Sequence, residues 1–446
     1  MCRMSRSELL DDVLAAARRA GADAADVVLV ERRALVVDWR LGTLEMIERK
    51  DQVDLGVRVL VGRRTATAAT NRLERASIGP LIEDAVAAAR LLPEDPWAGL
   101  AAAEQLATGW PDLDLVDPDE PTLDQLQQAA AAAEDSARSV AGVSNSDGAS
   151  AHWSDDRFTL VATNGFRGTH RRTRHGIGVT VLAGTGTDLQ RDHEHRRATH
   201  RIDLPSPEVI GRLAGERTVR RLGPRKVATA SVPVVYAPRA AASLLRHLAG
   251  AIGGEAVAAG RSFLKDRLGQ RVFAPGVTVT DDPLRRRGLA SRPFDGEGIG
   301  GHERRPIEDG VLTGWFLDLA SARRLGLAST GHASRGGAAL GGPGPTNLVL
   351  APGPIAPAAL LADIKSGFYV TELMGMGVNT ITGDYSRGAS GFWIENGALT
   401  HPVSDVTVAG NLAAMFQSLV PAADLDVQGS VDAPTVRIDG MIVAGK

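Results

Sequence analysis

The sequence has a single cysteine, Cys2, in a chain of 446 residues. One cysteine forms no intramolecular disulfide, so the fold cannot depend on a disulfide framework. Lysine is also scarce, because only five of the 50 basic residues are lysine and the other 45 are arginine. Since alanine is abundant as well, this bias indicates genome composition and is no signature of binding.

Long hydrophobic runs and a strong net charge are missing too. No window approaches about 18 uninterrupted apolar residues, which a membrane-spanning helix requires. The net charge of −3 gives no bulk electrostatic reason to expect nucleic acid or a membrane surface as partner. The first residues are polar and charged and contain no apolar core of a signal peptide. We therefore expect a soluble protein of the cytoplasm.

The remaining composition is that of an ordinary globular protein. Hydrophobic residues make up 43% and charged residues 23%. The length predicts two or three domains. We divide the chain into an N-terminal α/β module (1–95), a central α+β segment (96–222) and a β-rich C-terminal domain (223–446).

The first 95 residues predict a helix, several strands and a second helix. Ser7 can cap a helix that runs to about Ala20, where Gly21 ends it. Apolar residues at helical spacing predict another helix over 77–91, before Pro93. Between the helices the pattern predicts strands at 27–30, 34–39, 44–48 and 53–61.

The central segment opens with a connection rich in proline and acids, residues 93–121. Helices follow at 122–140 and 204–221, with strands at 149–153, 158–163 and 176–182 between them. Gly223-Pro224 marks the boundary to the third part. There we expect a strand at 232–236, a helix at about 239–251, a hairpin around Asp309-Gly310 and a last strand at 435–443. The fold class is α+β.

The most distinctive stretch is Gly375–Gly410. Its first half is dense in glycine, interleaved with small polar and charged residues, which allows positive φ or close backbone approach. In its second half, Asn396-Gly397 separates two apolar runs and predicts a hairpin with a type I′ turn. From the residues alone, a tight corner of a β-sheet is the simplest interpretation.

Residues 378–397, VNTITGDYSRGASGFWIENG, closely resemble the signature of the TldD/PmbA family, on the side of its TldE (PmbA) subunit. Further matches include Ile307–Leu312 and Ala322–Leu327. The resemblance implies an α+β fold of the TldD/PmbA type. It also implies a subunit of a cytosolic metalloprotease that trims or degrades flexible peptides.

The catalytic member of such a pair carries HExxxH on the helix that opens its C-terminal domain, and a cysteine near the C-terminus. That set would hold zinc and supply a general base for the bound water. In this sequence Arg246 and Ala251 stand at the two histidine positions and His247 at the glutamate position, and no cysteine follows Asn411. The resemblance therefore implies a subunit with no catalytic residues and no metal of its own. A TldD-like partner would supply the zinc.

We expect the loop Gly383–Gly391 to line a peptide cavity or the interface with that partner. The candidate residues are Gly383, Asp384, Tyr385, Ser386, Arg387, Gly388 and Ser390. The substrate would be an unfolded or precursor peptide, recognised through its backbone as an added strand. Removal of a leader peptide and degradation of a small unstable protein both remain open.

The best rival metal site is Asp192-His193-Glu194-His195 with His200 nearby. His193 and His195 could point to one face of a strand, although the neighbouring arginines favour a solvated loop or edge. A self-sufficient hydrolase that uses these histidines stays open, as does a homodimeric scaffold without enzymatic role. Gly296–Gly301 fits G-x-G-x-x-G without a following helix, so we expect a flexible loop there. For the cluster Arg285-Arg286-Arg287 we expect solvated surface.

Overall fold

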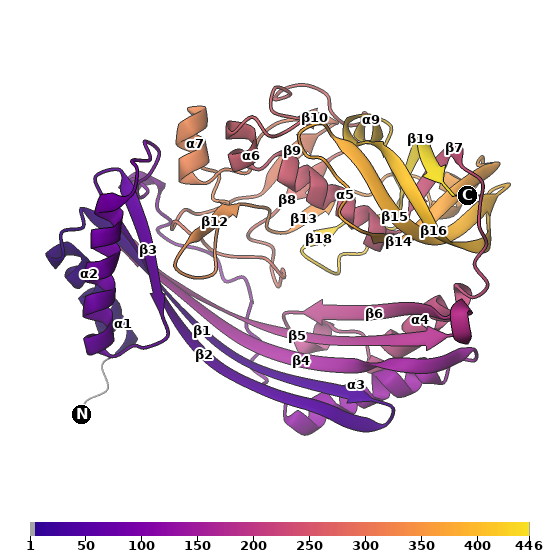
Figure 1. Ribbon diagram of the computed structural model, residues 1–446, viewed down its shortest axis with the longest axis horizontal. Coiled ribbons are helices and arrows are strands. Elements are labelled where there is room, and N and C mark those ends of the chain that lie inside the picture. Colours follow the sequence, from indigo (N-terminus) through magenta and orange to yellow (C-terminus); the bar gives the residue numbers. More distant parts are fainter. Residues whose placement is uncertain (1–4, 446) are drawn as a thin grey trace.

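The computed structural model of the chain describes residues 5–445 (Figure 1). The prediction that no intramolecular disulfide forms rests on the single cysteine, Cys2, which lies outside the described residues. Helices and strands are mixed throughout, with a β-rich C-terminal part, so the predicted α+β class is confirmed. No helix in the described part of the chain is long and apolar enough to cross a bilayer.

A long, curved antiparallel sheet runs through the first half of the chain (Figure 1). Its order is β3-β2-β1-β4-β5-β6. Because β1 pairs with β4 from Asp26 to Trp39, the predicted segments 1–95 and 96–222 share this one sheet. The strands are β1 (Ala24–Arg40), β2 (Thr43–Val61), β3 (Arg64–Thr70), β4 (Val143–Ala162), β5 (Arg167–Ala183) and β6 (Gln190–Ala198).

These strands are longer than the sequence pattern predicts. Charged residues such as Arg32 and Arg33 interrupt the apolar pattern, and for that reason we expected two short strands where β1 is continuous. In the sheet, Arg32 lies opposite Asp156 and Arg33 opposite Asp155, with N–O distances of 2.6 and 2.7 Å. Opposite charges on paired strands stabilise the ladder, so the charged residues extend the sheet and do not end it.

Four helices cover this sheet. The helices α1 (Arg6–Arg19) and α2 (Arg75–Leu91) form one core with β1 and β2, and α3 (Leu123–Arg138) and α4 (Pro207–Arg220) form a second core beside it. All four predicted helices are confirmed within a few residues. The cap of α1 was wrong, because Ser5, and not Ser7, accepts a hydrogen bond from the amide of Glu8.

The described C-terminal part contains two large sheets, of six and five strands, and a small sheet of two strands, β11 (Ala333–Arg335) and β12 (Leu340–Pro343). The six-stranded sheet has the order β16-β15-β14-β7-β19-β17, and an additional pairing of β16 with β19 closes it on itself. Its strands are β7 (Ala230–Tyr236), β14 (Ser366–Met374), β15 (Asp384–Glu395), β16 (Ala398–Asn411), β17 (Val420–Pro421) and β19 (Val436–Ala444). The five-stranded sheet has the order β10-β9-β8-β13-β18, with strands β8 (Val279–Asp281), β9 (Arg304–Glu308), β10 (Val311–Leu312), β13 (Leu348–Leu350) and β18 (Val431–Asp432).

The helix α5 (Pro238–Ala251) lies between the two large sheets, in the largest apolar core of the described chain. Both predicted hairpins are present, since Asn396-Gly397 has φ values of 49° and 81° and Asp309-Gly310 of 46° and 77°, as type I′ turns require. The remaining short elements are α6 (Gly254–Ala258), α7 (Leu319–Leu325), α8 (Pro357–Leu361) and α9 (Leu412–Gln417).

Candidate functional site

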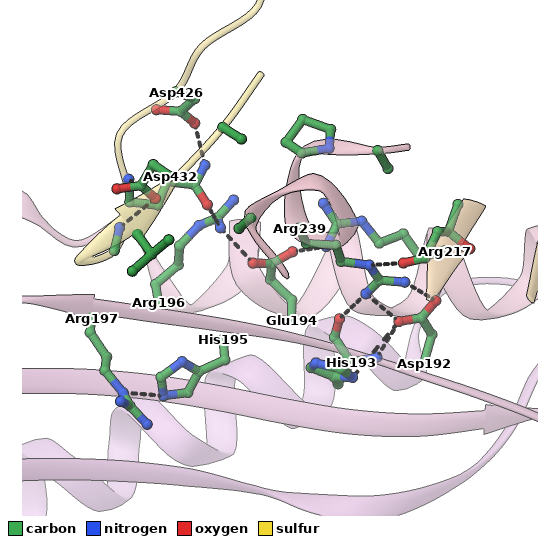
Figure 2. Close-up of a pocket in the computed structure, with 18 of the residues that line it drawn as sticks. Asp192, His193, Glu194, His195, Arg196, Arg197, Arg217, Arg239, Asp426 and Asp432 are labelled. Atoms are coloured by element: carbon green, nitrogen blue, oxygen red, sulfur yellow. Dashed lines mark hydrogen bonds and ion pairs between the residues drawn. The ribbon is translucent and has the colours of Figure 1, made fainter. Parts of the chain in front are cut away.

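A cavity of about 1090 Å³ lies between the edge of the long sheet and the C-terminal part (Figure 2). Residues 192–197 of β6 form one wall, the end of α4 and the first turns of α5 form others, and the loop 426–433 closes the far side. Among the described residues, nine arginines but only four carboxylates line it. The lining therefore has a formal surplus of five positive charges.

Two carboxylates at this wall are buried and form ion pairs with arginines. The side chains of Asp192 and Glu194 are each 3% exposed. Asp192 accepts hydrogen bonds from Arg239 at 2.7 and 2.8 Å and pairs with Arg221 at 3.2 Å. Burial opposes ionisation of Asp192, but the hydrogen bonds and charge of Arg239 outweigh it and lower its pKa to about 2.

Glu194 pairs with Arg196 at 2.8 Å and also with Arg217 of α4. Arg221 extends the network to Glu372 on β14, at 2.5 Å. These buried ion pairs join β6 and α4 to α5 and β14, so the wall of the cavity is also the contact between the two halves of the chain. Such charges hold the cavity in shape and are not free to act as acids or bases.

Other cavity arginines are less engaged. Within residues 5–445, neither Arg197, Arg220 nor Arg246 forms an ion pair with a carboxylate. Arg197 donates to the imidazole of His195 at 3.2 Å, and Arg220 lies over the ring of Phe392, 5.0 Å from its centroid. Arg246 is exposed on α5. Three of the cavity walls thus present a cation that is available to an anionic ligand.

The residues of α5 do not fit zinc. Arg246 lines the cavity and carries a fixed positive charge. Ala251 is completely buried in the core and offers no ligand atom. His247 is the only imidazole of the three, and burial, with the charges of Arg387 and Arg246, lowers its pKa to about 4. Among residues 5–445 no group of three histidine, cysteine or acidic side chains is arranged to hold a metal ion.

The rival histidines are not brought together as a site. His193 and His195 lie on β6, the edge strand of the sheet, which agrees with the expected solvated edge. His195 stacks on His152 with ring centroids 5.9 Å apart. It also accepts a hydrogen bond from Arg197, as Figure 2 shows. His200 is instead buried beside Asp114, with its Nε2 2.9 Å from the backbone oxygen. The three imidazoles have different partners.

The signature stretch has a different form from the one we predicted. Asp384–Glu395 is the strand β15 and not a loop, because it pairs with β14 on one side and β16 on the other. Among the candidate residues, Tyr385 and Ser390 are buried, while Asp384 and Ser386 are exposed and Arg387 is half-buried. The lining of the cavity in this chain includes none of the candidates Gly383, Asp384, Tyr385, Ser386, Arg387, Gly388 and Ser390. Their predicted place at a cavity enclosed with the partner, or at the interface with it, stays a prediction.

The glycines of this stretch serve close strand packing. A Cβ atom at Gly391 would lie 1.9 Å from the backbone oxygen of Tyr369, and one at Gly377 would lie 2.0 Å from that of Ser386. No side chain fits at these distances. The simplest interpretation of the sequence, a tight sheet corner, therefore describes the local structure.

A second charged cluster, which the sequence did not suggest, lies where the loop after Phe294 meets β1 and β2. Asp26 pairs with Arg58 and, at 2.6 Å, with Arg335, and all three are buried. Beside them, burial and the neighbouring Asp295 raise the pKa of Glu297 to about 8. Glu297 accepts a hydrogen bond from the amide of Leu319 at 2.8 Å. The loop Gly296–Gly301, expected to be flexible, is packed up to Ile299.

Comparison with known proteins agrees with this architecture. Family models match in three places: PmbA/TldA metallopeptidase domain 1 at residues 25–89, the central domain at 116–222 and the C-terminal domain at 229–445. The chain is 36% identical to metalloprotease PmbA of Escherichia coli O157:H7, over 95% of this chain and 93% of that protein. It is 32% identical to a PmbA homologue of Haemophilus influenzae, over 96% and 94%.

Solved structures show the same fold. A protein from Bacteroides thetaiotaomicron, described as a candidate modulator of DNA gyrase, superimposes with a TM-score of 0.91 at 27% identity, covering 99% of this chain and all of that one. TldE from Thermococcus kodakarensis superimposes with a TM-score of 0.87 at 18% identity, over 98% and 100%. The second likeness bears on the fold alone. Taken with the family models and the identity to PmbA, it leads to one conclusion: the chain belongs to the PmbA/TldD metallopeptidase family.

Proposed function

We propose that this chain is the non-catalytic, TldE-like subunit of a two-chain metallopeptidase of the cytoplasm. One observation carries the proposal: the three motif positions of α5 hold Arg246, His247 and Ala251, and Ala251 is completely buried. A cation, a neutral imidazole and a methyl group form no zinc site. A TldD-like partner with HExxxH would bring the zinc and the general base, and this chain would bring peptide-binding surface.

The cavity supports a role in holding peptides. β6 is the last strand of its sheet, and its residues 192–197 line the cavity one after another. The edge of a sheet can pair with an extended peptide through backbone hydrogen bonds, which admits many sequences. In this proposal the substrate is an unfolded or precursor peptide, which loses a leader or is degraded.

The exposed part of the signature stretch is proposed to contact the partner. Asp384 is held by the hydroxyl of Thr382 at 2.6 Å, and Arg387 donates to the backbone oxygen of Met374 at 3.1 Å. Nearby Met376 is 91% exposed, as an interface residue can be in a separated subunit. Alanine at both Asp384 and Arg387 should weaken pairing with the TldD-like chain. Unchanged pairing and unchanged cleavage would remove this role.

Reconstitution tests the proposal. This chain, an HExxxH homologue from the same genome and an equimolar mixture are each incubated with an unfolded peptide, and cleavage is followed by mass spectrometry. We expect cleavage by the mixture, and loss of cleavage when the motif glutamate of the partner is changed to glutamine. Cleavage by this chain alone would contradict the proposal and would bring back the self-sufficient hydrolase.

A further inference from the structure

We propose that the cavity between β6, α4 and α5 selects peptide segments that carry carboxylates, either acidic side chains or a free C-terminus. Peptide as the ligand rests on the proposed function. The selectivity for negative charge rests on the cavity itself.

The local charge is opposite to that of the whole chain. The net charge of the protein is −3, whereas the described lining of the cavity has nine arginines and four carboxylates. Two of those carboxylates, Asp192 and Glu194, are each already bound by two arginines. A concave surface with one sign of charge raises the local concentration of ligands with the opposite charge.

The available cations come from three different elements that line the cavity. Arg197 comes from β6, Arg220 from the last turn of α4 and Arg246 from α5. Arginine presents its N–H groups as a planar fork that matches the two oxygens of a carboxylate. Arg172, deeper in the wall, already donates hydrogen bonds to the backbone oxygens of Leu289 and Ser291, at 2.9 and 2.6 Å.

The positive surface continues beyond this cavity. A neighbouring cavity of about 390 Å³ shares Arg196 and Arg197 with it and adds Arg285, Arg286 and Arg287. The last three form the cluster that the sequence suggested was plain solvated surface. Arg285 is partly buried and donates to Asn347 at 3.2 Å and to the backbone oxygen of Gly429 at 3.0 Å. Arg286 and Arg287 already pair with Asp114, and Arg287 also with Asp203, so Arg285 is the added arginine without an ion pair among the described residues. Cations along two adjoining cavities suit an extended chain with several negative charges better than one small anion.

The observations favour a peptide over a nucleic acid. Single-stranded nucleic acid binds where aromatic rings are open for base stacking. Among the described lining residues, Tyr369 and Phe392 are the only phenylalanine, tyrosine or tryptophan side chains, and Arg220 already covers the ring of Phe392. Of the two lining imidazoles, that of His195 is already stacked on His152. The edge of β6, in contrast, offers backbone groups to an extended peptide.

Fluorescence anisotropy with the full chain tests the proposal. Four labelled peptides of equal length are compared: acidic, neutral, basic, and neutral with an amidated C-terminus. We expect the acidic peptide to bind about tenfold more tightly than the neutral one at low salt, and this ratio to shrink as salt screens the charges. A loss of affinity on amidation would assign the site to a terminal carboxylate, and no loss would assign it to acidic side chains; both results support the proposal.

The double variant R220Q/R246Q should lose about tenfold in affinity for the acidic peptide and keep its affinity for the neutral one. Neither arginine takes part in an ion pair with a described residue, so folding is preserved, which circular dichroism checks. The matched control is R212Q, on α4 but outside the cavity, where Arg212 pairs with Glu216.

Different negative results in these binding experiments would overturn different proposals. Equal binding of acidic and neutral peptides would overturn the charge selectivity and leave the proposed function intact. Binding of no peptide would overturn both. Tighter binding of a single-stranded oligonucleotide than of the acidic peptide, lost in R220Q/R246Q, would show that the cavity serves nucleic acid and would overturn the proposal.

Discussion

The imidazole of His247 lies edge-on to the ring of Tyr385, with ring centroids 6.0 Å apart and ring planes at 77°. The first residue belongs to α5, at the position where a catalytic glutamate is expected in the partner. The second belongs to the glycine-rich stretch that carries the family resemblance. The two features are thus in direct contact, and in this chain the contact is aromatic packing. At neutral pH the imidazole is uncharged, because its pKa is about 4.

Restoring a motif histidine at position 251 should not create a metal site. Ala251 is completely buried in the C-terminal core, so Ala251→His forces a larger polar ring into packed space. We expect a loss of about 2 kcal/mol or more in the free energy of unfolding, measured with denaturant, and no gain in bound zinc. Arg246→His, at an exposed position on the same helix, is the control and should be nearly neutral. A stable Ala251→His variant that binds zinc would contradict the description of α5.

Gly391→Ala should destabilise the closed sheet severely. Its Cβ would lie 1.9 Å from the backbone oxygen of Tyr369, on the paired strand β14, so the ladder must shift. We expect a loss above about 3 kcal/mol in the free energy of unfolding. Gly314→Ala is the matched control, since no heavy atom lies within 4 Å of its added Cβ. Equal stability of the two variants would show that β14 and β15 are not paired in this register.

Asp192→Asn should weaken the contact between the two halves of the chain. The change leaves the buried Arg221 and the half-buried Arg239 against a neutral side chain. Breaking a buried ion pair from one side costs about 3–5 kcal/mol, and we expect a loss of that order in the free energy of unfolding. Glu216→Gln breaks an exposed pair with Arg212 and should cost less than about 1 kcal/mol. If both changes cost the same, the ion pairs at β6 do not hold the wall together.

Ionisation of Glu297 should contribute to the pH dependence of the free energy of unfolding. Its pKa is raised from 4.5 to about 8 in the folded chain, by burial and by Asp295. The folded state therefore holds the proton more firmly than the unfolded state, so the contribution to stability is full below pH 4.5 and is lost as the pH rises to about 8. Glu297→Gln should reduce the fall in the free energy of unfolding between pH 6 and pH 9. Exposed Glu308→Gln should leave that fall unchanged, and an unchanged fall in both variants would contradict the buried position of Glu297.

Local features of the fold could be predicted from the sequence because local physics decides them. The helix 77–91 follows from apolar spacing and Pro93, and the turn at Asn396-Gly397 follows from its need for two positive φ values. The extent of β1 could not be predicted, because Arg32 and Arg33 end an apolar pattern and find their partners, Asp156 and Asp155, more than a hundred residues away.

The cavity could not be predicted from the sequence either, because the residues that form it are far apart along the chain. Its charged wall reads in sequence as a polar run, Asp192–Arg197, and such runs usually mark solvated loops. Asp192 is buried only because Arg221 and Arg239 reach it from α4 and α5. The degenerate motif, in contrast, was visible in the sequence, since it depends on which residues stand at three positions and not on their surroundings.

The most direct test of the central claim is the zinc content of this chain purified alone, measured by mass spectrometry per mole of protein after dialysis. We expect zinc near background, because Arg246, His247 and Ala251 form no site. The TldD-like partner, treated in the same way, should retain close to one zinc per chain. One zinc per chain retained by this protein would contradict the account, and His193, His195 and His200 would then be the first residues to substitute.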